Sequence, residues 1–526
     1  MSAFTDFLRS QRRLGWGIAA SLVLAAGVEG LVLLNPDTHA YEKYRTAGFS
    51  ALALGWAFVL ALFLLRKILS LEFSICAVAR VTLEEALRMR AAILLLGAIG
   101  MLLVVLPASL DAETPLRFRI QTFLSYAISG LTFLLSLMTI FLASGGLSGE
   151  IEDYRIFNAM SKPISRAQFL IGKWLGVFAL DAMLILVGGL GIYVTALGLS
   201  NQTALDKIDR RIVDNELLTA RESSDPQPPE DLAQRVAKRW QEYQKNYAEE
   251  IQRLGADFAF RNVQNLELND WLSIAPMEEA TFIFKGLPGP EQGKPVQFRY
   301  KFFSSKAPPD GTLTILLVVN NIHKLAWKIT PDAYEVLTIP AKFLSPDGHM
   351  QISITNRNPA HPNESISTTL TFPTDKGIEV LYEVSSFGPN LARSLSLDLL
   401  KLAFLSALGL LGAAYLSFPV ACLKSLVLYV LALSSDFILS SMADFKHIDE
   451  LDTSATVMES FKYLFVALGT VLRQFSRFDP TAMVVQGRFI NWNEIARGFF
   501  WIGMVYAGVC LLLAWVIFQR RELARQ

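Results

Sequence analysis

The stretch SGGLSGEIEDYRIFNAMSKPISRAQFLIGK (Ser144–Lys173) lies between two long apolar runs, Phe123–Ala143 and Phe169–Leu199. A charged insert of this kind cannot lie in hydrocarbon, where polar groups without partners are costly, so we expect a turn at a membrane face. Basic residues gather in cytoplasmic loops, which places this turn on the cytoplasmic side. Basic residues of the turn include Lys162, Arg166 and Lys173. The pattern therefore indicates a membrane protein whose charged turn forms a contact surface on the cytoplasmic side, rather than a soluble enzyme.

The composition also indicates a membrane protein. Of the 526 residues, 52% are hydrophobic and only 18% are charged, whereas soluble domains carry about 25% charged residues. The formal net charge of zero hides a segregation, because Met1–Arg13 and the tail QRRELARQ (Gln519–Gln526) are both basic. Both termini are therefore expected in the cytoplasm, which requires an even number of spans.

A spanning helix needs about 20 apolar residues, and on that basis the chain has about eight spans. The predicted spans are Leu14–Leu34, Gly48–Leu69, Ala91–Ser109, Phe123–Ala143, Phe169–Leu199, Leu397–Pro419, Leu423–Leu439 and Gly498–Phe518. We interpret the first as a retained helix, since it is too long for a signal peptide and lacks a small-residue cleavage site. A ninth apolar run, Val457–Phe475, is interrupted by charges, so an amphipathic or re-entrant helix on the outer face fits it better than a span.

One hydrophilic region, Ser200–Asn390, is long enough to form a domain outside the membrane, and the topology makes it extracytoplasmic. We expect residues 200–275 to be helical, with two amphipathic helices in Leu205–Leu254 around the breaker SDPQPPED (Ser224–Asp231). From residue 276 to 390, segments of period two such as ATFIFKGL, VQFRYKFF and MQISITN alternate with turns, which is typical of an antiparallel β-sandwich. The cysteines Cys76, Cys422 and Cys510 all lie outside this region, so its core must hold without disulfides.

The predicted fold is thus a polytopic α-helical membrane protein with about eight transmembrane helices and an inserted extracytoplasmic α+β domain that contains a β-sandwich. The predicted divisions are an amino-terminal hairpin (1–73), a first helical half (74–199), the inserted domain (200–390) and a second helical half (391–526).

Few residues suggest chemistry. Asp181 lies deep in the fifth predicted span, where charges are expensive and often functional, and is a candidate for a polar pathway or a contact between helices. A structural hydrogen bond is an equal alternative. The chain has no G-x-x-x-x-G-K-[ST] loop, so we do not expect it to bind ATP itself. Neither a cofactor, a metal ion, a catalytic group nor a nucleic-acid partner is predicted.

Three segments resemble one family when they are taken in order. CAVARVTLEEALRMRAAILLL (Cys76–Leu96) looks like an interfacial elbow helix that leads into a span. GEIEDYRIFNAMSKPISRAQFLIGKWLG (Gly149–Gly176) is similar to a coupling-helix loop, and YAGVCLLLAWVIFQRREL (Tyr506–Leu523) closes the chain on a charged end. The segments, with the short turn SFPVACLK (Ser417–Lys424), resemble the type-2 ABC exporter permeases, in the branch of copper-enzyme maturation and gliding-motility permeases.

This resemblance implies a permease of the bacterial inner membrane that pairs with separate cytoplasmic ABC ATPase subunits and with a second permease copy, identical or not. ATP binding would close the ATPases and push on the loop between the fourth and fifth spans. The implied coupling residues are Glu150, Glu152, Asp153, Tyr154, Arg155, Phe157, Lys162, Pro163, Arg166 and Lys173.

Three functions stay open at this point. The chain exports an unknown substrate; or it transmits ATPase strokes mechanically to an extracytoplasmic partner; or it is a membrane scaffold or receptor with a binding β-sandwich. The sequence carries no pocket chemistry that would name a substrate.

Overall fold

The computed structural model describes residues 54–521, except 89–90, 112, 158–160, 162, 307–310, 358–367, 445–462, 464, 468 and 474. The chain divides into two compact units. We call the first the helix unit; it comprises the chain up to Ala220 and from Ser385 onward. The second, the β unit, is Arg221–Val384. The predicted assignment of residues 200–390 to the outer side of a membrane stays a prediction.

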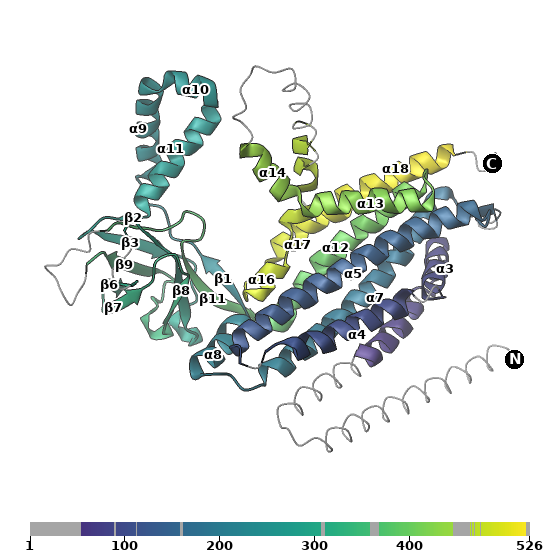
Figure 1. The fold of residues 1–526 in the computed structure, drawn as a ribbon, viewed down its shortest axis with the longest axis horizontal. Coiled ribbons are helices and arrows are strands. Elements are labelled where there is room, and N and C mark those ends of the chain that lie inside the picture. Colours follow the sequence, from purple (N-terminus) through teal and green to yellow (C-terminus); the bar gives the residue numbers. More distant parts are fainter. Residues whose placement is uncertain are drawn as a thin grey trace. The chain divides into compact units, whose positions relative to one another are not determined.

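Long helices that lie side by side form the helix unit, and α5, α7 and α12 pack against one another at its centre (Figure 1). A helical stretch at residues 54–68 precedes the labelled elements. The elements of this unit are α3 (Ser74–Arg88), α4 (Ala91–Ser109), α5 (Leu116–Glu152), α7 (Arg166–Ser200), α8 (Lys207–Ile212), the π-helix η1 (Val213–Leu217), α12 (Phe387–Ala413), α13 (Phe418–Leu433), α14 (Ser435–Asp444), α16 (Thr481–Val485), α17 (Trp492–Gly498), the π-helix η4 (Phe499–Tyr506) and α18 (Ala507–Arg520).

Within the described residues, four helices are long and apolar enough to cross a membrane: α5, α7, α12 and the continuous run α17–η4–α18 (Trp492–Arg520). Two shorter apolar helices lie at Gly97–Pro107, inside α4, and at α13. These helices support a membrane protein, and a total of eight spans stays a prediction. The first predicted span, Leu14–Leu34, lies outside the described residues, as do residues 457–462, 464, 468 and 474 of the run Val457–Phe475.

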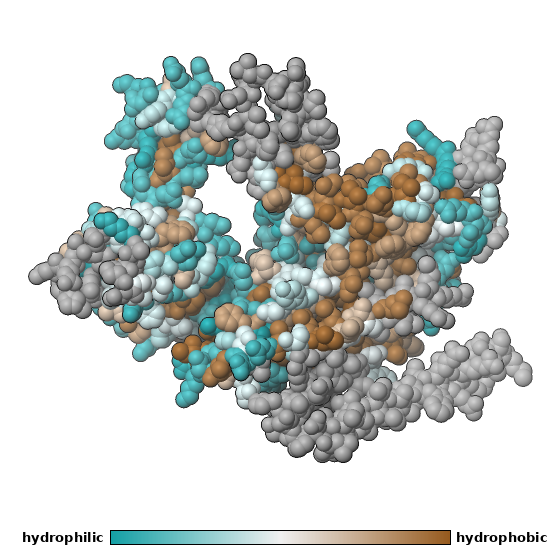
Figure 2. All heavy atoms as spheres, in the orientation of Figure 1, coloured by the Kyte–Doolittle hydropathy of each residue, from teal (hydrophilic) through white to brown (hydrophobic). Residues whose placement is uncertain are grey.

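The four long helices differ in what covers them. In the most apolar window of α5, α7 and α12, 61%, 72% and 78% of the residues are buried inside the protein, but only 22% of the Trp492–Arg520 window is buried. Figure 2 shows apolar side chains gathered on the face formed by α13, α17 and α18. Val427 of α13, Phe500 of η4 and Leu512 of α18 are among the exposed apolar residues of the helix unit. Such a surface is expected to face lipid or a second membrane protein.

Glycines let the central helices approach closely. An added Cβ at Gly188 of α7 would lie 2.7 Å from Leu131 Cδ1 of α5, and one at Gly409 of α12 would lie 2.8 Å from Ala143 Cβ. Small residues at such crossings let two helix backbones approach closely. In lipid no hydrophobic effect draws helices together, and the van der Waals contacts of this close packing hold them instead. These glycines therefore serve packing between helices.

The first turn of α5 takes its cap from a distant residue. Its N-cap, Pro115, provides no side-chain cap. The backbone amides of Leu116 and Arg117 instead donate to the carboxylate of Asp209 in α8, at 2.7 and 3.0 Å. Asp209 is buried, and its negative charge also complements the positive end of the α5 dipole.

The β unit contains antiparallel sheets and a helical hairpin. The two four-stranded sheets have the orders β1-β11-β4-β8 and β3-β9-β6-β7, and a three-stranded sheet has the order β2-β10-β5. The strands are β1 (Thr219–Ser224), β2 (Ser273–Ile274), β3 (Glu279–Phe284), β4 (Val296–Tyr300), β5 (Phe303–Ser304), β6 (Leu313–Val319), β7 (His323–Ile329), β8 (Glu335–Ile339), β9 (Met350–Thr355), β10 (Leu370–Thr371) and β11 (Ile378–Ser386). The helices are α9 (Leu232–Asn246), α10 (Ala248–Leu254) and α11 (Ala256–Trp271), with short 3₁₀ turns at Pro290–Gln292 and Ala341–Phe343.

Both four-stranded sheets contribute to one hydrophobic core. Phe282 of β3, Ile352 of β9 and Leu317 of β6 are buried in the same cluster as Phe298 of β4 and Val380 of β11. Their alternation with exposed residues, as in β3, is the period-two pattern from which strands were predicted. The sandwich arrangement of the sheets stays a prediction.

Of the two amphipathic helices predicted around the breaker Ser224–Asp231, α9 follows it as predicted, but no long helix precedes it. Only short α8 and η1 precede the breaker, the chain enters it as strand β1, and α9, α10 and α11 follow it. The pairing of β1 with β11 explains the difference, because a sheet edge can override local helical propensity. Strand β7 was also missed; the turn before it places Asn320 and Asn321 at positive φ, which is typical of hairpin turns.

Candidate functional site

The predicted coupling residues lie at one end of the helix unit, although not all of them in a loop. Helix α5 continues through Glu152, so Glu150 and Glu152 are helical, where the sequence had suggested a loop. A helix of 37 residues is about 55 Å long, whereas a bilayer core is about 30 Å thick. The last turns of α5 can therefore project beyond hydrocarbon, where the exposed Glu152 can meet water.

A buried ion-pair cluster holds three helices together at this end. The Lys173 ammonium of α7 lies 2.5 Å from Glu150 Oε1 of α5 and 3.2 Å from Glu85 Oε2 of α3. The Lys173 side chain is 3% exposed, that of Glu150 is 13% exposed and that of Glu85 is 36% exposed. Two carboxylates around one ammonium compensate the cost of burying the charge. We call this group the Lys173 cluster.

Helix α3 packs closely on α7 beside this cluster. A Cβ at Gly172 would lie 2.6 Å from Val78 Cβ, and one at Gly176 would lie 2.7 Å from Thr82 Cβ and 2.8 Å from the Ala79 carbonyl oxygen. The two helices can approach this closely only because α7 carries glycine at these positions. The predicted elbow helix, α3, is thereby fixed to the start of α7.

Arg166 ties the start of α7 to the end of α18. Its Nη1 donates to the carbonyls of Phe518 and Gln519, at 2.7 and 2.9 Å, and its guanidinium lies 5.6 Å from the centre of the Phe518 ring. These carbonyls belong to the last turn of α18, where no intrahelical amide is left to bind them. Arg166 is therefore a structural residue, and the resemblance alone did not reveal this role.

The turn between α12 and α13 joins the same end. Ser148 Oγ of α5 donates to the Leu416 carbonyl at 3.4 Å, the Phe418 amide lies 3.5 Å from Glu152 Oε1, and Arg521 Nη1 donates to the Ala414 carbonyl at 2.9 Å. The four segments that carried the family resemblance are thus brought together by direct contacts, although they are separated by hundreds of residues.

Four of the first five residues that follow α5 are exposed, and Ile156 among them is buried. Asp153 and Arg155 pair with each other, and the rings of Tyr154 and Phe157 stack with their centres 6.2 Å apart. Tyr154 is 54% exposed and Phe157 is 41% exposed, and Tyr154 has a φ of 57° that turns the chain sharply. Pro163 is exposed as well, and Lys162 lies outside the described residues. An exposed aromatic pair on a tightly turned segment is suited to bind another protein.

Asp181 has a different environment. It is fully buried, and its Oδ1 lies 2.9 Å from Thr139 Oγ1 of α5, whereas its Oδ2 has no hydrogen-bond partner. Thr139 Oγ1 also lies 2.7 Å from the Leu135 carbonyl, to which a helical threonine ordinarily donates. One hydroxyl has one proton, so Thr139 shares it between the Leu135 carbonyl and Asp181 Oδ1, and a carboxyl that kept its own proton could donate back to Thr139.

The sequence analysis missed a second buried carboxylate, Asp398 of α12. Its Oδ1 lies 3.6 Å from Lys401 Nζ one turn later, and both side chains are buried. The ammonium also lies 5.6 Å from the centre of the Phe475 ring. The i, i+3 spacing of the two charges was visible in the sequence, although the inward direction of both side chains was not.

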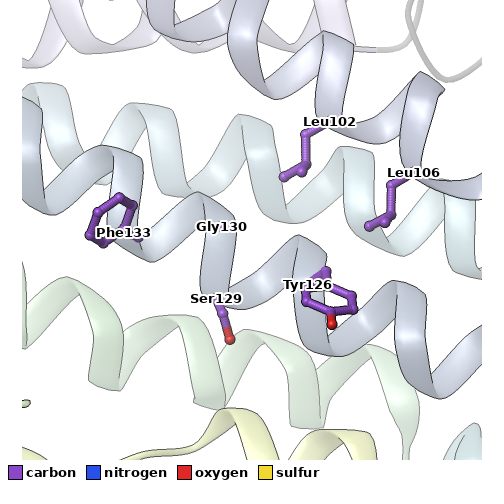
Figure 3. A pocket seen from close by; sticks show the side chains of 6 residues that line it. All are labelled: Leu102, Leu106, Tyr126, Ser129, Gly130 and Phe133. Carbon is purple, nitrogen blue, oxygen red and sulfur yellow. The ribbon is translucent and has the colours of Figure 1, made fainter.

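No metal centre is seen in the described part of the chain. It contains no group of three His, Cys, Asp or Glu residues able to hold a metal ion. A groove of about 560 Å³ between α4 and α5 is lined by Leu102, Leu106, Tyr126, Ser129, Gly130 and Phe133 (Figure 3). The groove has no charged lining, so it offers hydrocarbon contact rather than recognition of a polar substrate.

Residues 118–220, which include α5, the exposed turn and α7, match the family model described as ABC-2 family transporter protein. The chain is similar to the ABC-2-type permeases. This match confirms the predicted resemblance and indicates a membrane permease of an ABC transporter, a transport subunit for which ATPase partners are expected. The branch within these permeases stays a prediction. No curated protein and no solved structure shows a significant match to the chain.

Proposed function

We propose that the chain is the permease subunit of an ABC exporter of the bacterial inner membrane, driven by separate cytoplasmic ATPases through the turn after α5. The observation that carries this proposal is the meeting of α5, α3, the α12–α13 turn and the end of α18 around Lys173 and Arg166. A second permease copy, a lipid environment and an unidentified substrate belong to the proposal. Both termini would be cytoplasmic and residues 200–390 extracytoplasmic.

The contacts suggest how a push on the turn would reach the spans. Tyr154 and Phe157 would bind the ATPase, since they are exposed and lie at the tip of α5. The ionic contact of Lys173 with Glu150 would carry the displacement from α5 to α7, and Arg166 would carry it to α18. Helices joined in this way tilt together rather than bend singly, which is the kind of rigid-body motion that opens and closes transport proteins.

The test is to change Tyr154 and Phe157 to serine together in the tagged full chain and to measure the ATPase that copurifies in mild detergent. We expect at least a roughly tenfold loss of the ATPase, since exposed aromatic anchors commonly contribute 2 kcal/mol or more to binding. The matched control changes Phe303 and Tyr334 of the β unit, which are 45% and 47% exposed. That control is expected to retain the ATPase.

Arg166→Ala is less suitable for this test, because it removes donors from the last carbonyls of α18 and could act through stability alone. Equal ATPase recovery from the Tyr154–Phe157 variant and the wild-type chain would contradict the coupling role of the turn. Loss of the ATPase from both the variant and its β-unit control would also contradict a contact confined to the turn.

Mechanical transmission to an outer partner is a second candidate, and it is favoured by one observation. Strand β11 ends at Ser386 and α12 begins at Phe387, so no linker separates the β unit from a candidate span. ATP-dependent flux in vesicles would favour export. A change in protease sensitivity of the β unit on ATP addition, with no flux, would favour transmission.

A further inference from the structure

Arg393 of α12 has two aromatic neighbours but no acceptor. Its guanidinium carbon lies 4.7 Å from the centre of the Phe489 ring and 5.3 Å from that of Trp492. Its Nε and Nη1 are covered and make no hydrogen bond. No carboxylate among the described residues forms an ion pair with it. The two rings stabilise the cation in part, but they leave its hydrogen-bonding groups and its charge without a counterpart.

The two rings are held in place by the rest of the helix unit. Asn390 Nδ2 donates to the Arg488 carbonyl at 2.7 Å, and the Ile490 amide donates to Asn390 Oδ1 at 2.9 Å, so α12 fixes the segment on both sides of Phe489. Gly487, at a φ of 63°, lies so close to the Glu216 carbonyl that no Cβ would fit. The arrangement of Arg393 between two rings is therefore built into the fold.

A neighbouring arginine shows that this lack of a counter-charge is specific. Arg497 of α17 lies one turn and a half beyond Trp492 and has its own carboxylate, Glu494 Oε1, at 3.5 Å. Arg393 lies six residues into the candidate span α12, or about 9 Å from its start. Trp492 is 64% exposed, and both tryptophan and arginine are typical of the headgroup level of a bilayer.

We propose that Arg393, Phe489 and Trp492 form a binding site for the phosphate of an anionic phospholipid headgroup. A phosphate oxygen supplies the acceptor and the negative charge that the guanidinium lacks, and arginine–phosphate contacts are among the stronger hydrogen bonds. Nη2, unlike Nε and Nη1, is not among the covered nitrogens that make no hydrogen bond, so the phosphate would first bind there. The aromatic rings would keep the guanidinium at headgroup depth, and the exposed Trp492 would lie beside the glycerol.

The experiment compares the wild-type full chain with Arg393→Gln, in nanodiscs of phosphatidylglycerol and of phosphatidylcholine, by native mass spectrometry after release from the disc. We expect the wild-type chain to retain phosphatidylglycerol about tenfold more often than Arg393→Gln does, since a charged hydrogen bond and the ion pair are lost together. Arg393→Lys should retain an intermediate amount, because it keeps the charge but not the planar fork. Retained phosphatidylcholine should differ less between the chains, because its choline cation neutralises the charge of the phosphate.

Arg497→Gln is the matched control, since it removes an arginine that already has its carboxylate, and it should retain as much phosphatidylglycerol as the wild-type chain. Addition of millimolar inorganic phosphate separates a lipid site from a free-anion site. Displacement of the lipid by phosphate alone would overturn the lipid assignment. Equal retention of phosphatidylglycerol by the wild-type chain and by a monodisperse Arg393→Gln or Arg393→Lys would overturn the site itself.

Discussion

Helix α7 buries two ionisable side chains eight residues apart, and their surroundings differ in charge. At its start, Lys173 is surrounded by Glu150 and Glu85 and bridges α7 to α5 and α3. Further along, Asp181 has a single threonine hydroxyl and one oxygen without a partner. The first environment supplies opposite charges to the buried ion, and the second supplies none.

The difference shows which part of the helix can transmit force. An ion-pair cluster is strong, but it depends on every member being present, because one lost charge leaves the others buried and unpaired. A neutral acid paired with a hydroxyl holds helices weakly and tolerates exchange for a similar polar group. We therefore expect the start of α7 to be intolerant of substitution and its middle to be tolerant. The variants described next test this contrast.

Removal of the cation at the start of α7 should have the largest effect. Lys173→Met leaves Glu150 and Glu85 facing each other without an ammonium, and we expect it to lower the free energy of unfolding by roughly 3–5 kcal/mol. Denaturant unfolding of the purified chain in detergent measures this loss. Lys173→Arg should lose much less.

A double variant tests whether the loss of stability comes from the unpaired carboxylates. In Lys173→Met with Glu150→Leu, the most buried carboxylate is removed with its partner, so part of the stability should return. If the double variant is as unstable as the sum of the two single variants, the charges at the start of α7 do not act as a cluster.

Close packing of α3 on α7 should give an intermediate effect. Gly176→Ala places a Cβ against the backbone of Ala79 and the Cβ of Thr82, and we expect a loss of about 1–3 kcal/mol. Gly146→Ala in α5 is the matched control, since an added Cβ there has nothing within 4 Å. Thermal unfolding in detergent compares the two variants. Similar melting temperatures for both would mean that α3 and α7 are not in close contact.

Exchange of the neutral acid should have the smallest effect. Asp181→Asn keeps a donor toward Thr139 and changes no charge if the carboxyl is protonated, so we expect a loss below about 1 kcal/mol. The infrared carbonyl band of a protonated carboxylic acid should also disappear from the spectrum of this variant. A loss of several kcal/mol, with no such band in the wild-type chain, would show that Asp181 is ionised.

The sequence predicted some helices closely and others poorly. The apolar run Ala91–Ser109 forms α4 with the same bounds, because its composition is uniform. Helix α12 instead begins ten residues before the predicted start at Leu397, since its first turns carry polar residues such as Asn390 and Arg393. The Asn390 side chain forms hydrogen bonds with backbone groups of residues 488 and 490. Contacts between residues so far apart in the chain cannot be predicted from local hydrophobicity.

Several residues of the candidate site could be predicted from the sequence, but the contacts between them could not. The turn after α5 and the polar Asp181 stood out because charges interrupt apolar runs. The role of Glu85 could not be foreseen, since it depends on α3 lying beside α7, 88 residues further along the chain. The same holds for Arg166, which contacts α18 more than 350 residues away. Tertiary packing turns these separate residues into one site.

The cap on α5 has a consequence for the synthesis of the protein. The first amides of α5 donate to Asp209, which is synthesised 93 residues after Leu116. At roughly 5–20 residues per second, a ribosome adds that length in about 5–20 seconds. During that interval the first amides of α5 would lack their acceptor. They could bind Asp209 only after α7 has been synthesised. Insertion of these two helices is therefore expected to finish as a single event rather than one after the other.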